Sequence, residues 1–156
     1  MAEEFRFVVE MSKLEQLNPN LSDVSDFIDY YLARNKRVRH FIKDRKNAGK
    51  YFLISSEPGM ITKQKKEISK EDAEQIIRKA ILIVKKKGAG RIWIEGIEGY
   101  SEIVSAFKPG EKKHFLEELH VEFETDQKEI PKLEKSMKPI KIIRVGLFDY
   151  LTRDNK

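Results

Sequence analysis

The chain of 156 residues contains no cysteine. This absence excludes a disulfide framework and any metal site built from thiolates. Apolar runs are short, and none approaches the roughly 20 residues that a membrane-spanning helix needs. The N-terminal segment carries Glu3 and Glu4 and lacks the apolar core of a signal peptide. These absences predict a cytoplasmic protein without a membrane partner.

Catalytic and metal-binding motifs are also scarce. The histidines His40, His114 and His120 are scattered and show no clustered spacing of the kind found in zinc sites. There is no G-x-S-x-G nucleophile motif. The glycines at 88 and 90 follow a predicted helix, whereas a phosphate-binding P-loop follows a strand. We therefore predict no catalytic residue, no metal ligand and no cofactor, and we favour a protein that is not an enzyme.

Positive charge is abundant and unevenly distributed. The chain has 31 Lys and Arg against 26 Asp and Glu, a net charge of +5. Segment 34–50 places eight cationic residues against the single carboxylate of Asp44, while 111–134 holds eight acidic and four basic residues. Such separation is typical of a protein with one face that contacts a polyanion. A solvated, unevenly charged surface explains the same composition.

Several segments alternate apolar and polar residues, which is the period of half-buried strands. Segment 119–125 places Leu119, Val121 and Phe123 inward. The intervening His120 and Glu122 are expected to face solvent. Further strands are predicted over 4–10, 50–56, 60–68, 91–96 and 140–148.

Helical spacing of apolar residues predicts two main helices, over 22–34 and 69–87. In the second helix, Ser69 and Asp72 resemble a capping box, and Gly88 supplies a C-terminal stop. A short helix is expected over 111–118.

The sequence does not decide the secondary structure of three other segments. Segment 35–43 fits a helix or a strand, as does 101–107, and 126–139 fits a loop or a frayed helix. The pattern as a whole predicts a single α+β domain over 1–156, with a mainly antiparallel sheet that is open or closed like a barrel or tunnel. The ends, 1–3 and 152–156, are expected to fray.

The basic residues supply the candidate binding site. If 37–43 is a strand, Arg37, Arg39 and Lys43 share one face, and side chains from neighbouring strands can converge on the same phosphates through charge-assisted hydrogen bonds. Nearby aromatic residues can stack on bases, although Trp93 is expected in the core. The predicted phosphate-binding or nucleic-acid-binding residues are Arg34, Arg37, Arg39, Lys43, Arg45, Lys46, Lys63, Lys65, Lys66 and Arg91.

The function expected from these residues is binding of DNA or RNA phosphates, or of another phosphate polyanion, on a basic surface. Two alternatives remain. One is a metal-dependent phosphohydrolase or polyphosphate binder, and the other is an adaptor whose basic and acidic segments contact protein partners.

The order of motifs resembles the CYTH, or triphosphate tunnel, family. The motifs are YYL, RVRHF, GKYFLISS, KEISKEDAEQII, RIWIEG and LHVEFE, in that order. The resemblance implies an antiparallel β-tunnel whose basic side chains hold a polyphosphate and whose glutamates place Mg²⁺ or Mn²⁺. By this resemblance Arg37, Arg39, Lys65 and Arg91 face the phosphates, while Glu67 and Glu122 match retained acids.

The chain departs from that family at its acidic positions. The family's N-terminal E-x-E-x-K signature falls on the segment AEEFR, which leaves only Glu4 and a substituted Arg6 at the lysine position. His120 stands at the first acid of the late strand, and Ser55 stands where a lysine is expected. Metal-binding carboxylates of the family pattern are therefore missing from this chain.

Overall fold

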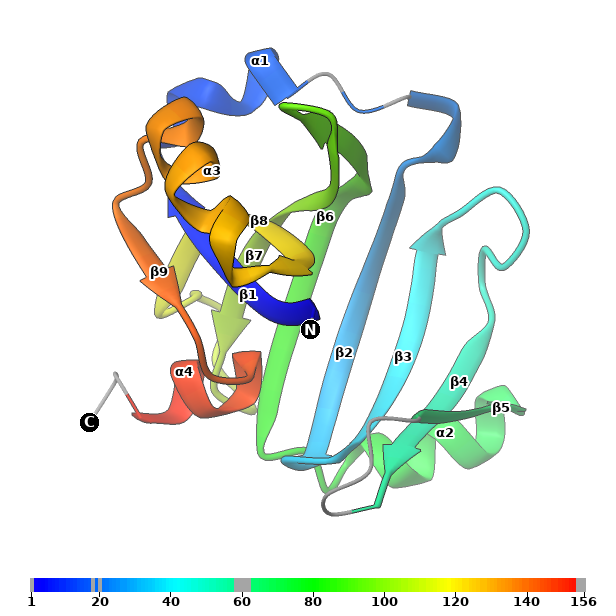
Figure 1. Cartoon of the computed structure of the whole chain (residues 1–156). Coiled ribbons are helices and arrows are strands. Elements are labelled where there is room, and N and C mark those ends of the chain that lie inside the picture. The colour runs from blue at the N-terminus through cyan, green and yellow to red at the C-terminus, as the bar shows by residue number, and fades with distance from the viewer. Residues whose placement is uncertain (1, 18, 20, 58–62, 154–156) are drawn as a thin grey trace. The chain divides into compact units, whose positions relative to one another are not determined.

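The computed structural model describes residues 2–17, 19, 21–57 and 63–153, whose fold is α+β. Nine strands form one antiparallel sheet in the order β5-β4-β3-β2-β6-β7-β8-β1-β9 (Figure 1). The strands are β1 (Ala2–Val9), β2 (Ser25–Ala33), β3 (Lys36–Lys43), β4 (Tyr51–Ser56), β5 (Lys63–Ile68), β6 (Leu82–Ile94), β7 (Ile97–Phe107), β8 (Leu116–Asp126) and β9 (Lys141–Ile143). The α-helices are α1 (Leu14–Leu17), α2 (Lys70–Ile77), α3 (Ile130–Met137) and α4 (Leu147–Arg153).

The sheet is open, because β5 and β9 end the strand order without pairing to each other among the described residues. The barrel-like alternative is therefore wrong for this part of the chain. The chain divides into two compact units. Unit 1 comprises Met1–Val24, Gly88–Val104 and Glu118–Lys156, and unit 2 comprises Ser25–Lys87 and Ser105–Glu117.

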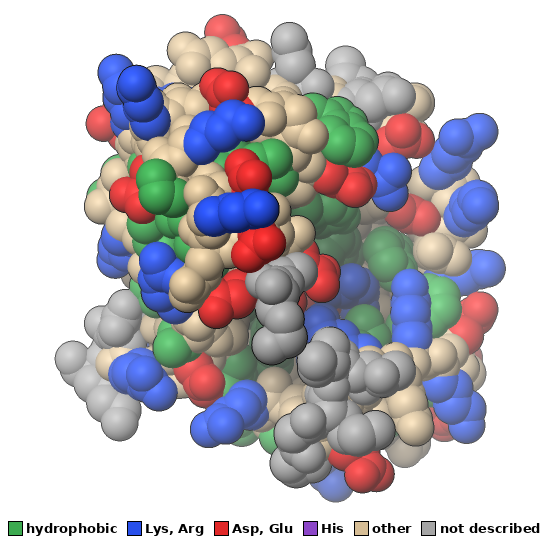
Figure 2. Space-filling model, viewed as in Figure 1, with side chains coloured by type: hydrophobic (Ala, Val, Ile, Leu, Met, Phe, Trp, Pro, Cys, Tyr) green, Lys and Arg blue, Asp and Glu red, His purple; other side chains and the backbone are tan. Residues whose placement is uncertain are grey.

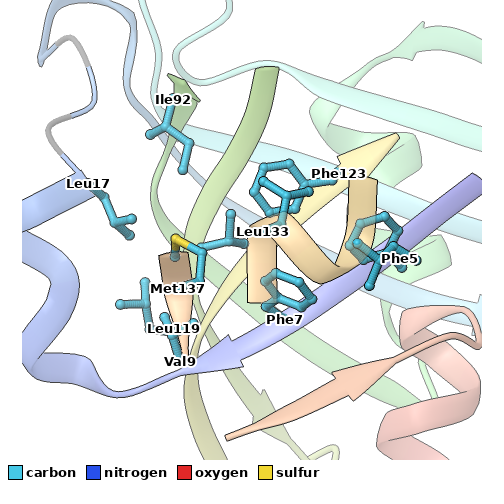
Figure 3. Packing of buried hydrophobic residues seen from close by; sticks show 11 residues of the cluster. Phe5, Phe7, Val9, Leu17, Ile92, Leu119, Phe123, Leu133 and Met137 are labelled. Atoms are coloured by element: carbon cyan, nitrogen blue, oxygen red, sulfur yellow. The ribbon is translucent and has the colours of Figure 1, made fainter. Parts of the chain in front are cut away.

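Unit 1 has an apolar core between its strands and α3. Alternation turns Phe5 and Phe7 of β1 and Phe123 of β8 to the same side, with ring centroids 5.4–5.7 Å apart. Figure 3 shows Leu133 and Met137 of α3 packed among these strand residues. The strands predicted over 4–10 and 119–125 are confirmed, since their apolar alternation is the pattern that this core buries.

Gly99 of β7 lies against this core, and its substitution has a predictable cost. A Cβ atom built there would lie 2.7 Å from Cε1 and 3.0 Å from Cδ1 of Phe123, which is 1% exposed. We expect Gly99→Ala to lower the free energy of unfolding by about 1–3 kcal/mol, because the buried ring cannot move away without repacking. Urea unfolding measures this change, and Gly110→Ala is an unsuitable control because its positive φ adds strain.

A matched control is Gly146→Ala, since Gly146 has no atom within 4 Å of its added Cβ and no positive φ. The steric explanation is wrong if both alanine variants change stability equally.

Unit 2 contains β2, β3, β4, β5, the first part of β6, the end of β7 and the start of β8, with α2 against β3. The predicted cap of α2 is confirmed, because Ser69 Oγ accepts a hydrogen bond of 3.1 Å from the Asp72 N–H. The strand predicted over 50–56 is confirmed as β4. Of the strand predicted over 60–68, the part from residue 63 is confirmed as β5, and 60–62 lie outside the described residues.

The helix predicted over 22–34 is wrong, because this segment contains β2 after a short 3-10 turn (Leu21–Asp23). Phe27, Asp29 and Tyr31 are buried in strict alternation. Because Asp29 occupies the middle buried position, the apolar residues alone do not show a period of two. The open segment 35–43 is likewise a strand, β3, because it pairs with β2 on one side and β4 on the other.

The helix predicted over 69–87 is correct only in its first half. α2 ends at Ile77, and β6 starts at Leu82 and contains all three lysines that were expected at the helix end. Gly88 lies within β6 and has a positive φ of 64°. The sequence LIVKKK fits both periods, and pairing with β2 in the sheet decides for the strand.

The structure also decides the four remaining segments. Segment 101–107 belongs to β7 and 126–139 contains α3, whereas the helix predicted over 111–118 is wrong, because no helix forms there and β8 begins at Leu116. Only the first part of the strand predicted over 140–148 forms, as β9, before α4 begins.

Candidate anion-binding site

Cationic side chains of unit 2 gather on one side of its sheet, which we call the basic face. Cross-strand pairing aligns Asp29 with Arg39 and Arg37 with Ile54, which is in turn opposite Lys65. Because side chains two residues apart share a side of a strand, the members of the face follow directly. They are Phe27, Asp29 and Tyr31 of β2, Arg37, Arg39 and Phe41 of β3, Phe52 and Ile54 of β4, Lys63, Lys65 and Glu67 of β5, and Lys86 of β6.

Asp29 stands at the centre of the basic face and is fully buried. Arg39 binds it with two hydrogen bonds, Nε to Oδ1 at 2.8 Å and Nη2 to Oδ2 at 3.0 Å. Arg37 Nε and Lys86 Nζ lie 3.5 and 3.4 Å from Oδ2. Burial raises the pKa of Asp29, but Lys86 and the two arginines outweigh it and hold the pKa far below its usual value. Three cations therefore surround one permanent anion.

Aromatic rings lie under these cations. The guanidinium carbon of Arg39 is 4.1 Å from the Phe27 centroid, and Lys65 Nζ is 4.5 Å from the Phe52 centroid and 5.3 Å from that of Phe41. Rings beneath a cation exclude water from one side of it and favour its charge. The recessed head group of Arg39 therefore lies in a medium of lower polarity than bulk water, where ionic contacts are stronger, whereas Lys65 is exposed.

The two arginines of the basic face are recessed and partly accessible, whereas Lys86 is buried and Lys65 is exposed. The side chains of Arg37 and Arg39 are 15% and 18% exposed. Arg37 Nε is buried and donates no hydrogen bond, although it lies in ion-pair range of Asp29. A buried donor without an acceptor is costly. The Nε–H of Arg37 is therefore an unsatisfied buried donor beside an excess of positive charge.

The structure brings together four of the ten predicted residues, Arg37, Arg39, Lys63 and Lys65. Lys66 points to the opposite side of β5, since it is paired with Leu53. Lys43 is exposed and lies beyond a register shift in the β2–β3 pairing.

The other predicted residues lie in turns or in unit 1. Arg34 is in the β2–β3 turn, and Arg45 and Lys46 are in the β3–β4 loop. Arg91 belongs to unit 1 and binds Glu98 at 2.6 Å in an exposed pair. Figure 2 shows Lys and Arg side chains spread over β3, β4 and β5, so the convergence at Asp29 could not be read from surface charge.

Two residues of the cluster were missed by sequence reasoning, Asp29 and Lys86. Both interrupt an apolar alternation, Phe27-x-Asp29-x-Tyr31 and Val84-x-Lys86, and both are buried. The sequence signal that could have found them is a charged residue at a position where the apolar alternation of a strand predicts a buried side chain. Trp93 was also misplaced, because it is 63% exposed on β6 and does not belong to the core.

Unit 1 holds a second buried polar cluster, on the side of β1 and β8 away from the aromatic core. Arg6 Nη1 donates to Glu102 Oε2 at 2.9 Å, and Arg6 Nη2 lies 2.6 Å from Glu122 Oε2. Glu102 is 3% exposed. We call Arg6, Glu102, Glu122 and His120 the Arg6 cluster.

The prediction that His120 faces solvent is wrong, because this residue is fully buried. Its Nε2 donates to Glu118 Oε1 at 3.0 Å, so its Nδ1, 3.5 Å from Arg6 Nη1, is the acceptor of a neutral ring. Burial lowers the pKa of His120 and outweighs the opposing effect of Glu118. Tyr150 of α4 also donates to Glu118, at 2.9 Å, and so ties the C-terminal helix to β8.

Comparison with protein-family models matches none of them to this chain, and comparison with curated proteins gives no significant match. Within the described residues, no three or more His, Asp or Glu side chains are arranged to hold a metal ion. None of the described helices has the length and apolar character required to cross a membrane.

Proposed function

We propose that the protein binds a compact phosphate polyanion, a short run of linked phosphates, on the basic face of unit 2. The observation that carries this proposal is the convergence of Arg37, Arg39 and Lys86 on the single carboxylate of Asp29. Three positive charges against one negative charge leave an excess of two. Phosphate oxygens are the preferred partners of such grouped guanidinium and ammonium donors.

The spacing of the cations favours a compact anion over an extended nucleic-acid backbone. Arg37, Arg39 and Lys86 all lie within 3.5 Å of the same carboxylate, so they can meet one phosphoryl group or two adjacent ones. The loop cations Arg34 and Arg45 lie beyond opposite ends of β3, which has eight residues. A strand of that length spans roughly 25 Å, and the loop cations therefore do not extend this cluster.

Lys65 and Lys66 provide a matched test of the proposal. Both are exposed residues of β5, but Lys65 lies on the basic face and Lys66 on the opposite side. We expect isothermal titration calorimetry to show binding of inorganic tripolyphosphate. Lys65→Gln should weaken it about tenfold, the effect of losing one charge-assisted hydrogen bond, whereas Lys66→Gln should change it little.

The proposal fails if the protein does not bind tripolyphosphate, or if both lysine variants weaken binding equally, since diffuse charge then explains the affinity. Nucleic-acid binding is the competing function. It is supported instead if single-stranded DNA or RNA binds more tightly than tripolyphosphate at the same salt concentration, and if Arg45→Gln/Lys46→Gln abolishes that binding.

A further inference from the structure

We infer that the outer edge of β5 binds an extended, acidic segment of a partner protein, which adds to the sheet as a further strand. This site goes beyond the proposed phosphate binding and does not require it. β5 stands at one end of the strand order, and among the described residues only β4 pairs with it (Figure 1). The backbone N–H and C=O groups along its other edge form a template for a further strand.

The side chains of β5 leave this edge accessible. Lys63 to Glu67 are all exposed, and Ile68 is half-buried. A strand of this length extends over about 20 Å, which is sufficient to pair with a partner segment of similar length. Every second N–H of an antiparallel edge strand points away from its neighbour. Main-chain hydrogen bonds can therefore hold an added strand whatever its side chains are.

The charge of β5 determines which side chains the partner should have. The sequence KQKKEI contains three lysines and one glutamate. Lys65 and Lys66 are consecutive, so they point to opposite sides of the sheet. Two consecutive acidic residues of an added strand also point to opposite sides, and each then lies beside one of these lysines. Cross-strand pairs of opposite charge stabilise a sheet, and the edge is therefore complementary to an acidic pair.

Glu67 restricts the neighbouring position of the partner. It lies on the same side of β5 as Lys65, and its Oε1 is 3.9 Å from Lys50 Nζ. An acidic side chain directly opposite Glu67 would be repelled, so the partner needs a neutral or basic residue there. The edge thus fits a short acidic pair within an otherwise uncharged strand better than a uniformly acidic tail.

The same charges disfavour a second copy of this chain as the occupant. Two β5 strands side by side would bring the lysines of both copies together, and natural edge strands use lysines in this way to prevent self-association. An acidic segment is attracted by those lysines. Charge complementarity therefore favours an acidic partner over a dimer formed through β5.

The test is a titration of the protein with a synthetic peptide, followed by nuclear magnetic resonance. The peptide has the length of β5 and a central pair of glutamates flanked by threonine and valine. We expect shifts of the β5 amide signals and slower hydrogen exchange at every second β5 amide, the pattern that strand addition produces. A control peptide keeps the glutamates and has prolines as flanking residues. It has the same charge but lacks N–H groups that a strand needs, and it should leave the exchange unchanged.

Lys66→Gln separates this site from the proposed phosphate site. It should weaken peptide binding about threefold to fivefold, the effect of losing one exposed ion pair. Tripolyphosphate binding should stay the same, because Lys66 lies on the side of β5 away from the basic face. Lys70→Gln is the matched control, since it removes the same charge from an exposed lysine of α2, outside β5, and it should leave peptide affinity unchanged.

Three results would overturn the inference: a peptide that leaves the β5 amides unchanged, a proline peptide that binds equally well, or a Lys70→Gln variant that weakens binding as much as Lys66→Gln. Protection of β5 amides that rises with protein concentration in the absence of peptide would identify a second copy as the occupant, and this result also contradicts the inference. Failure of tripolyphosphate to bind overturns only the proposed function, because the peptide titration contains no phosphate.

Discussion

Asp29→Asn is expected to lower the free energy of unfolding by about 3–5 kcal/mol, the usual cost of removing one partner from a buried ionic cluster. The substitution keeps the size of the side chain and removes its charge. Arg37, Arg39 and Lys86 then face one another without an anion, and Lys86 is only 5% exposed. Chemical denaturation, monitored by circular dichroism, measures the loss.

Tripolyphosphate should restore much of the stability of Asp29→Asn, because a bound anion replaces the missing carboxylate and stabilises the folded state by mass action. The increase in melting temperature should be larger for this variant than for the wild type. Glu67→Gln is the control. It removes an exposed carboxylate from β5, whose nearest lysine contact is 3.9 Å, and should change stability by less than about 1 kcal/mol.

A normal stability for Asp29→Asn would mean that the three cations do not depend on Asp29. An equal thermal shift in both proteins would place the bound phosphate elsewhere. Either result contradicts the assignment of the basic face, and the two results do so independently.

Arg6→Met should lower the free energy of unfolding by about 3–5 kcal/mol, since it removes the cation that lies 2.9 Å from the nearly buried Glu102. Methionine fills most of the volume, so the loss reports charge more than packing. Adding Glu102→Gln should recover part of the stability, because it removes the buried negative charge that Arg6 balanced. The recovery, measured as a double-mutant cycle, gives the coupling energy of the two side chains.

Arg91→Met is the matched control for this pair. Arg91 and Glu98 are also in unit 1 and 2.6 Å apart, but their side chains are 69% and 51% exposed. Water and salt screen such a pair, and we expect a change of at most about 1 kcal/mol. Equal effects of Arg6→Met and Arg91→Met would contradict the argument that burial sets the cost.

The strands with a regular apolar period were predictable from the sequence. In β1 and β8 the residues that enter the core are Phe, Val or Leu at every second position. No helical spacing of apolar residues competes with that period. The cap of α2 was predictable for a similar reason, because Ser69 and Asp72 interact within one turn. Local chemistry was sufficient in these places.

The apolar periodicity predicted the wrong secondary structure where a charged residue is buried. Asp29 and Lys86 are unfavourable inside a protein unless they are paired, so hydrophobic patterns count them as exposed. Their burial depends on Arg39 and on each other, which lie on different strands. The pairing register that brings them together is a property of the sheet, and the segments around both residues were consequently predicted as helices.

The candidate site shows the same division between local and long-range information. Sequence alone determined that the segment around Arg37 and Arg39 is strongly basic and that the chain has no thiolate ligands. The tertiary structure decided which cations converge, that Lys65 and Lys66 face opposite sides, and that Arg6 binds Glu102 from 96 residues away. The physical reason is that composition fixes the number of charges, whereas the free energy of each charge depends on its partners and burial, which long-range strand pairing sets.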